Sequence, residues 1–214
     1  MAVSIKWLAH ASFQITGDGK IVYIDLEQYG APSEKADLIL VTHAHTDHCD
    51  PEKIGELRKE GTVVIAPVDC ASKIGGDVKT LKPGEEATVG KVKVKAFHAY
   101  NTKRFRSPGN PFHPKGYGVG YLITVGGKRI YHTGDSDFIP EMREVGPVDV
   151  ALLPSGDTYT MNNAEAAEAA IAINPRIAVP MHRLSTNPEE FKRRVEGRSN
   201  IKVVLLREGE EVQL

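Results

Sequence analysis

The segment DLILVTHAHTDH, residues 37–48, ends an apolar run with three histidines and an aspartate. Its first half, residues 37–41, has the composition of a buried strand. A helix would turn residues i and i+2 about 200° apart, so His43 and His45 can converge only in a turn or loop after that strand. Buried imidazoles and carboxylates need partners, and a divalent cation would supply one. The segment predicts a metal-binding loop at a strand end, the alternative being a solvated polar loop.

Three further candidate ligands stand where other apolar runs end. His98 follows residues 92–97, Asp135 follows the run that starts at residue 129, and His182 follows residues 177–181. Each histidine taken alone is more often structural than a metal ligand. Beside the cluster at 43–48, all three are expected to share one rim and to bind metal.

The remaining pattern predicts an α/β fold rich in strands. Gly126-Gly127 between two apolar runs predicts a two-residue hairpin, because glycine adopts positive φ without cost. Asp50-Pro51 predicts the start of a helix over 51–60, and two more helices are expected near 163–174 and 188–194. Clustered strands between few helices predict a four-layer αββα sandwich in one domain over 1–214. The expected strands cover residues 4–8, 21–24, 38–41, 63–66, 92–97, 118–125, 129–131, 150–153, 177–179 and 203–206.

One stretch, residues 99–117, lacks any regular period and contains three prolines. Lys103, Arg104, Arg106 and Lys115 give it four positive charges and no negative one, in a chain whose net charge is −1. We expect an irregular insert that folds over the metals and binds an anionic substrate, with Arg104 and Arg106 as the main contacts. A loop whose charges face water or another subunit is the alternative.

Composition excludes several classes of protein. With 214 residues, 41% of them hydrophobic, the chain can bury a core without disulfides, so Cys49 and Cys70 are expected to be thiols. Apolar runs are far shorter than the roughly 18 residues of a membrane span. The near-neutral charge argues against nucleic acid as a partner. A cytoplasmic protein acting on a small molecule is expected, with the oligomeric state left open.

The motifs resemble those of the metallo-β-lactamase superfamily. Its pattern is a strand-end aspartate, H-x-H-x-D-H, a later histidine, a bridging aspartate and a last histidine. The chain offers these in order as Asp25, residues 43–48, His98, Asp135 and His182. The start at 7–13 and the Pro-Met-His sequence at 180–182 more narrowly resemble small metal-dependent hydrolases related to the ascorbate-6-phosphate lactonase and to the N-acylphosphatidylethanolamine phospholipase D group.

The resemblance implies two divalent metal ions, zinc by default and manganese or nickel as alternatives. It implies a hydrolase in which a hydroxide between the metals attacks an ester, lactone or phosphodiester. Asp47 would hold the hydroxide and pass its proton to the leaving group, and Asp25 would organise the loop beneath the site. The implied ligands are His43, His45 and His98 for the first ion, Asp47, His48 and His182 for the second, and Asp135 for both.

The sequence leaves further residue roles and functions open. His10 and His113 are candidate substrate contacts, while His132 is expected to turn away from the metals. Redox di-iron relatives carry glutamate where this chain has His45, which argues against that chemistry. A metal-binding regulatory module without turnover and a nuclease-type phosphodiesterase are the two functions that compete with a small-molecule hydrolase.

Overall fold

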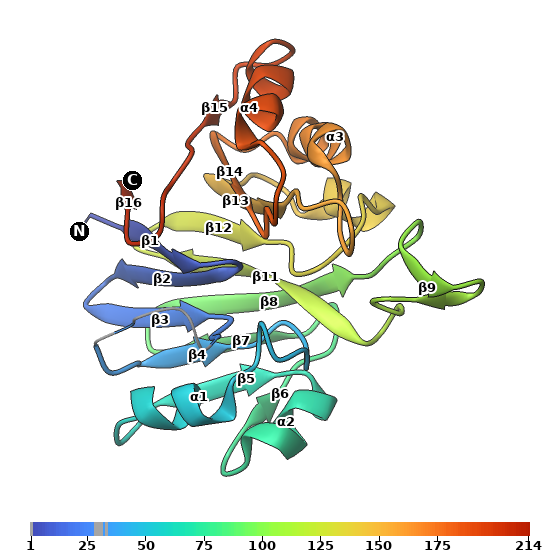
Figure 1. The fold of residues 1–214 in the computed structure, drawn as a ribbon. Coiled ribbons are helices and arrows are strands. Elements are labelled where there is room, and N and C mark those ends of the chain that lie inside the picture. Colours follow the sequence, from blue (N-terminus) through green and yellow to red (C-terminus); the bar gives the residue numbers. More distant parts are fainter. Residues whose placement is uncertain (1, 28–31, 33) are drawn as a thin grey trace.

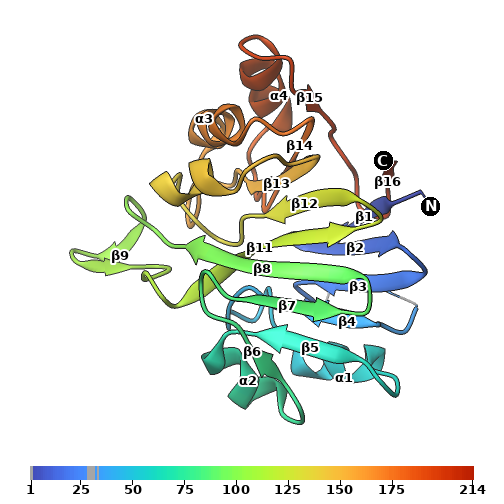
Figure 2. The ribbon, with the colours of Figure 1, turned by 180° about the vertical axis from the view of Figure 1, so that it is seen from behind.

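Two seven-stranded mixed sheets pack face to face in the computed structural model, which describes residues 2–27, 32 and 34–214 (Figure 1). Figure 2 shows the same layers from behind. The first sheet has the order β16 (Glu211–Gln213), β1 (Ser4–Ala9), β2 (Ser12–Gly17), β3 (Lys20–Ile24), β4 (Leu38–Leu40), β5 (Val63–Ala66) and β6 (Lys79–Thr80). The second has the order β15 (Lys202–Val203), β14 (Ile177–Met181), β13 (Val150–Pro154), β12 (Lys128–His132), β11 (Gly118–Val125), β8 (Val92–Ala99) and β7 (Glu86–Val89).

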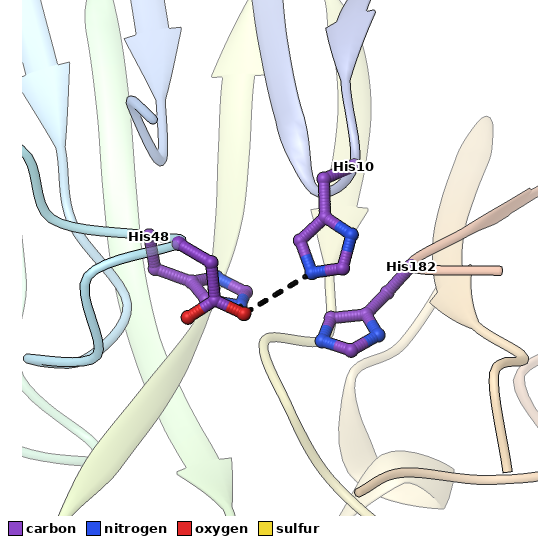
Figure 3. Close-up of side chains that lie close together, drawn as sticks. His10, His48 and His182 are labelled. Atoms are coloured by element: carbon purple, nitrogen blue, oxygen red, sulfur yellow. Dashed lines mark ion pairs between the residues drawn. The ribbon is translucent and has the colours of Figure 1, made fainter. Parts of the chain in front are cut away.

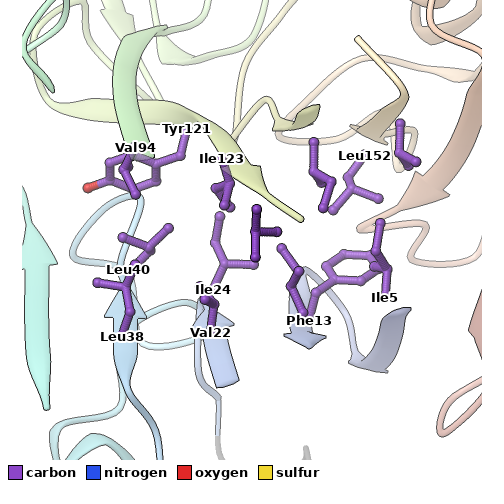
Figure 4. Packing of buried hydrophobic residues seen from close by; sticks show 14 of the residues in the cluster. Ile5, Phe13, Val22, Ile24, Leu38, Leu40, Val94, Tyr121, Ile123 and Leu152 are labelled. Atoms are coloured by element: carbon purple, nitrogen blue, oxygen red, sulfur yellow. The ribbon is translucent and has the colours of Figure 1, made fainter. Parts of the chain in front are cut away.

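The main core lies between the sheets, where both contribute fully buried aliphatic and aromatic side chains (Figure 4). Phe13 and Ile24 come from the first sheet, and Ile123 and Leu152 from the second. Removing each such side chain from water stabilises the fold by about 1.5–3 kcal/mol. This shared core fixes how the edges of the two sheets meet.

Helices cover the outer face of each sheet. α1 (Pro51–Leu57) and α2 (Val68–Ile74) pack on the first sheet, and η1 (Pro140–Glu144), α3 (Asn163–Ile173) and α4 (Pro188–Glu196) pack on the second (Figure 1). The expected four-layer αββα arrangement is confirmed. No helix in the described part of the chain is long and apolar enough to cross a membrane.

Local signals account for most element boundaries. The Asp50 side chain accepts hydrogen bonds from the first turn of α1, as predicted, although the helix ends at Leu57 rather than at residue 60. Gly126 and Gly127 adopt positive φ between Val125 and Lys128, which pair across the predicted hairpin. The strand β2 was not predicted, although the alternation of Phe13 and Ile15 with polar residues is the expected signal.

The insert at 99–117 is more regular than predicted. It contains a short hairpin of β9 (Phe105–Ser107) and β10 (Asn110–Pro111), which projects from the body of the protein beyond the ends of β8 and β11 (Figures 1 and 2). A backbone hydrogen bond from Asn101 N–H to His113 C=O closes the base of the insert. This closure returns the chain to the rim of the sheets.

Candidate metal centre

Titratable side chains converge at the edge where parallel strands of both sheets end. The Oδ2 atom of Asp135 lies 3.1 Å from His182 Nε2, 3.3 Å from His113 Nε2, 3.5 Å from His48 Nε2 and 3.9 Å from His43 Nε2. Asp135 is 4% exposed and its other oxygen, Oδ1, has no hydrogen-bond partner in the described chain. One carboxylate therefore stands at the centre of four imidazoles.

The backbone before Asp135 requires glycine. Gly134 has a φ of +65°, and a Cβ there would lie 2.6 Å from the carbonyl oxygen of Val119. On β11, a Cβ at Gly120 would lie 2.7 Å from the carbonyl oxygen of Thr133. These close approaches set Asp135 against the second sheet and aim its carboxylate into the cluster.

The first group of possible ligands consists of His43, His45 and His113. His45 Nδ1 lies 3.1 Å from His43 Nε2 and 3.2 Å from His113 Nε2. Nitrogens bound to one tetrahedral zinc at about 2.0–2.1 Å lie about 3.3 Å apart. The three nitrogens, with Asp135 Oδ2 beside them, therefore fit the size of a single divalent ion.

The second group consists of His10, Asp47, His48 and His182. Figure 3 shows the rings of His10, His48 and His182 turned toward one another, and Asp47 Oδ2 lies 3.3 Å from His10 Nε2. The Nε2 atoms of His48 and His182 are buried and lack hydrogen-bond partners among the described residues. Unpartnered buried nitrogens that face a carboxylate suit a second ion.

Hydrogen bonds behind the rings fix which nitrogen is free. Asp25 accepts hydrogen bonds of 2.7 Å from Thr42 N–H, Thr42 Oγ1–H and His48 Nδ1–H. Because Thr42 Oγ1 donates to Asp25, it accepts from His43 Nδ1–H at 2.9 Å. In their neutral forms both imidazoles therefore present an unprotonated Nε2 to the cluster, as metal ligands must. Asp25 holds the loop beneath the site, in agreement with its expected role.

The electrostatics of the cluster favour a bound cation. Burial lowers the pKa of His43 well below its ordinary value. Burial also disfavours protonated His48, but the carboxylates of Asp135 and Asp25 outweigh it and raise the His48 pKa well above the ordinary value. Burial would raise the pKa of Asp135, yet His182 and His48 hold it well below its usual range. The carboxylates of Asp25 and Asp135 therefore favour positive charge within the cluster, such as that of a metal ion.

Two of the clustered histidines have strained backbones. His10 and His182 have φ values of +45° and +44°, a region that costs a non-glycine residue about 1–3 kcal/mol. His182 N–H donates to His10 C=O at 2.9 Å, and Trp7 Nε1–H donates to the same oxygen at 3.0 Å. These bonds hold the two rings 3.8 Å apart between their centroids. Part of the backbone strain of the described chain therefore lies at the cluster.

His98 is the predicted ligand that the structure does not bring to the cluster. The strand β8 continues to Ala99 instead of ending at Phe97, so His98 lies inside the ladder and pairs with Val119. His113, predicted as a substrate contact, lies in the cluster instead. Its Nδ1–H donates to Asn101 Oδ1 at 2.9 Å, which leaves Nε2 free. No local sequence pattern predicts this position of His113, because the hydrogen-bonded closure of the insert returns it to the rim of the sheets.

Other candidate residues fall outside the cluster. His132 is saturated, since its Nε2–H donates to Ala11 C=O and its Nδ1 accepts from Gly134 N–H, so it turns away from the metals as expected. Cys49 and Cys70 are buried free thiols, as predicted.

A cavity of about 650 Å³ opens onto the cluster. Its lining includes His45, Asp47 and Asp135 together with two basic side chains, Arg106 and Lys73. The Arg106 guanidinium lies over the Phe112 ring at 5.3 Å, and Lys73 Nζ donates to the Ala44 carbonyl at 2.7 Å. The open face of the cluster is therefore flanked by positive charge.

Arg104 is not available to a substrate, contrary to prediction. Its guanidinium contacts the carboxylates of Asp137 at 3.2 Å, Asp157 at 2.8 Å and Glu165, and its side chain is 11% exposed. Burial disfavours the charged guanidinium, but these carboxylates raise its pKa. Arg104 thus anchors the insert to the loop before α3. The lysines of the insert are also paired, Lys103 with Glu165 and Lys115 with Glu141.

Replacing His113 by alanine is expected to lower bound metal by about one equivalent per chain, because its Nε2 completes the first group. The matched change His98→Ala should leave metal content unchanged, since His98 lies in the β8 ladder. Elemental analysis of both purified variants measures this. Loss of metal from His98→Ala but not from His113→Ala would make His98 the ligand instead.

The paired sheets, outer helices and histidine cluster at the strand ends together define the fold of the metallo-β-lactamase class. Residues 4–182 match the family described as the β-lactamase superfamily domain, and the chain belongs to this family. The resemblance predicted from the motifs is confirmed at the level of the superfamily.

Relatives match over the whole chain. A metal-dependent hydrolase of Pyrococcus abyssi is 38% identical over 99% of this chain and 100% of its own length, and one of Archaeoglobus fulgidus is 32% identical over 99% of both. The structure is similar to that of a metallo hydrolase from Ignicoccus hospitalis, with a TM-score of 0.82, 27% identity and coverage of 100% and 99%. A diiron β-hydroxylase from Streptomyces venezuelae, 15% identical over 99% of this chain and 54% of its own, shares the fold alone, with a TM-score of 0.74.

Proposed function

We propose that the protein is a hydrolase that depends on two divalent metal ions, with zinc as the default ion. The observation that carries this proposal is the convergence of two ligand groups on Asp135 Oδ2. His43, His45 and His113 would hold one ion, and Asp47, His48 and His182 the other, with His10 beside the second group. The names of relatives that match over the whole chain, metal-dependent hydrolases, support the same class.

Metal ions bound there would act as Lewis acids and make hydroxide available at neutral pH. The chain supplies positioning and proton transfer. Burial disfavours ionised Asp47, but its contacts with His10 and His48 hold its pKa below the ordinary value, so the carboxylate is ionised. Its side chain is 48% exposed and borders the cavity. Asp47 can therefore orient the attacking water and pass its proton to the leaving group.

The substrate is proposed to be a small anionic ester, lactone or phosphodiester. Arg106 and Lys73 line the cavity, and Arg106 Nη2 lies 3.4 Å from His45 Nε2. A guanidinium in this position can hold a carboxylate or phosphate by two hydrogen bonds next to the reacting group. The anion-binding role predicted for the insert thus falls to Arg106 alone among its arginines.

A metal-reconstituted activity screen tests the proposed class. The panel is bis-p-nitrophenyl phosphate, acyl-homoserine and sugar lactones, thioesters and a cephalosporin, each measured with zinc, manganese and nickel. We expect metal-dependent turnover of at least one ester, lactone or phosphodiester, abolished by chelation. Full metal content with no turnover of any of them would support a regulatory metal-binding module instead.

The two arginines of the insert should behave differently. Arg106→Ala is expected to raise KM for an active anionic substrate by about tenfold, which is about 1.4 kcal/mol of binding free energy, and to leave the melting temperature nearly unchanged. Arg104→Ala should lower the melting temperature, because it leaves the buried Asp137 carboxylate without its cation. Steady-state kinetics and thermal melting check both results. An unchanged KM for Arg106→Ala would remove the insert from substrate binding.

A further inference from the structure

A second cavity, of about 530 Å³, borders the candidate metal centre at His10 and Asp47. Asp47 lines both cavities, so a ligand lying across this residue would reach from one into the other. The walls of the second cavity include Trp7, Ala9 and Leu184, of which Leu184 is 49% exposed. Trp7 and Ala9 are themselves buried, so Leu184 provides most of the apolar surface that these walls offer to a short chain.

Glu27 gives this cavity an unusual polar group. It is 4% exposed, and its Oε1 atom has no hydrogen-bond partner among the described residues. The backbone beside it is fixed, since Leu26 N–H donates to His48 C=O at 3.0 Å and Asp50 N–H donates to Leu26 C=O at 2.9 Å. Burying an unpaired carboxylate costs several kcal/mol unless a partner offsets it, and the described part of the fold provides no such partner.

Arg183, the cation that lines this cavity, is already engaged. The Arg183 guanidinium lies 4.2 Å over the Trp7 ring and donates from Nη2 to Leu206 C=O at 3.1 Å. Glu208 is exposed and also lines the cavity. The acidic groups of the cavity are therefore not balanced by a contacting cation of the described chain. The first cavity has more basic walls, because Arg106 and Lys73 line it together with Asp47 and Asp135.

We propose that the second cavity binds a primary ammonium group on a short apolar chain, with Glu27 as its counter-ion. The three N–H donors of an ammonium would satisfy Glu27 Oε1, and its stem would pack on Trp7, Ala9 and Leu184. The proposal rests on the proposed function, for which it identifies the leaving part of the substrate. Asp47 borders both cavities and so can protonate a group that departs into the second one. The substrate then carries an anionic and a cationic end.

The protonation of Glu27 supports this assignment. Burial raises its pKa to about 7; Asp47 and Glu208 add to the rise, and His48 and His182 oppose it. Burial thus favours protonated Glu27 until a cation binds beside it. A bound ammonium favours the carboxylate, so binding should release a fraction of a proton per chain.

The test is calorimetric titration of the full, metal-loaded chain with n-butylammonium and with 1-butanol, its neutral counterpart, in two buffers of different ionisation enthalpy at pH 7. We expect n-butylammonium to bind at least tenfold more tightly than 1-butanol and to release protons. Glu27→Gln should abolish both the preference and the proton release. The matched control Glu211→Gln, at an exposed residue of β16, should retain both.

Leu184→Lys, at an exposed position, gives an independent check. The added ammonium should compete for Glu27 and weaken the binding of n-butylammonium at least tenfold. Equal affinity for n-butylammonium and 1-butanol in the wild-type protein, or unchanged binding in Glu27→Gln, would overturn the proposal. Neither result depends on turnover. If the activity screen finds hydrolysis but n-butylammonium does not bind more tightly than 1-butanol, only the ammonium-site proposal is contradicted. If n-butylammonium binds more tightly but no substrate is hydrolysed, the hydrolase proposal is contradicted and the ammonium-site proposal stands.

Discussion

Asp135→Ala is expected to lose nearly all metal and all measurable activity. Its Oδ2 atom is within 4 Å of four imidazoles that belong to both ligand groups, so this change disturbs both ions at once. Loss of His113 or of His10 removes a candidate ligand from one group only. The effect on metal content should therefore exceed those of His113→Ala and of His10→Ala.

Elemental analysis after gel filtration in metal-free buffer measures this effect. Asp77→Ala, at an exposed residue, is the matched control and should keep the wild-type metal content. Circular dichroism must show that Asp135→Ala remains folded. Equal metal content in Asp135→Ala and His10→Ala would contradict the central position of Asp135.

Asp47→Asn is expected to lower kcat by about 10² or more while most of the metal is retained, the usual scale for loss of general acid–base help. The amide oxygen can still approach the second ion, but the group can no longer take up and deliver a proton. His48 and His182 remain to hold that ion. The change therefore separates the proton-transfer role of Asp47 from its proposed role as a ligand.

The measurement is kcat with the best substrate of the activity screen, together with metal content of the same preparation. Asp77→Asn serves as the control for a surface change of equal charge. A near-normal kcat in Asp47→Asn would remove Asp47 from the mechanism. Parallel loss of metal and activity would show that it acts only as a ligand.

The sequence predicts most of the site because most of its members lie in loops that follow strand ends. Strand ends at one rim of the sheets bring His43, Asp135 and His182 together. Asp25, which also follows a strand, holds the loop at 42–48 beneath them. The same rule misplaced His98, because the ladder between β8 and β11 extends two residues beyond the apolar run. The length of β8 depends on its pairing with β11, and the apolar run at 92–97 alone does not predict that pairing.

The insert at 99–117 contains contacts that sequence patterns do not predict. Arg104 and Arg106 look equivalent in the sequence, but one is bound by Asp137, Asp157 and Glu165 and the other faces the cavity. The role of His113 likewise depends on its contacts with Asn101, which close the insert. Such tertiary pairings join residues of different loops and leave no periodic trace.

The most direct test of the account is the metal stoichiometry of the wild-type protein. Elemental analysis of protein purified without chelators, supported by calorimetric titration of the metal-free form with zinc, should give close to two equivalents per chain. The two ligand groups around Asp135 predict this value. One equivalent would contradict the two-metal site, and no retained metal together with no binding on titration would contradict the metal centre itself.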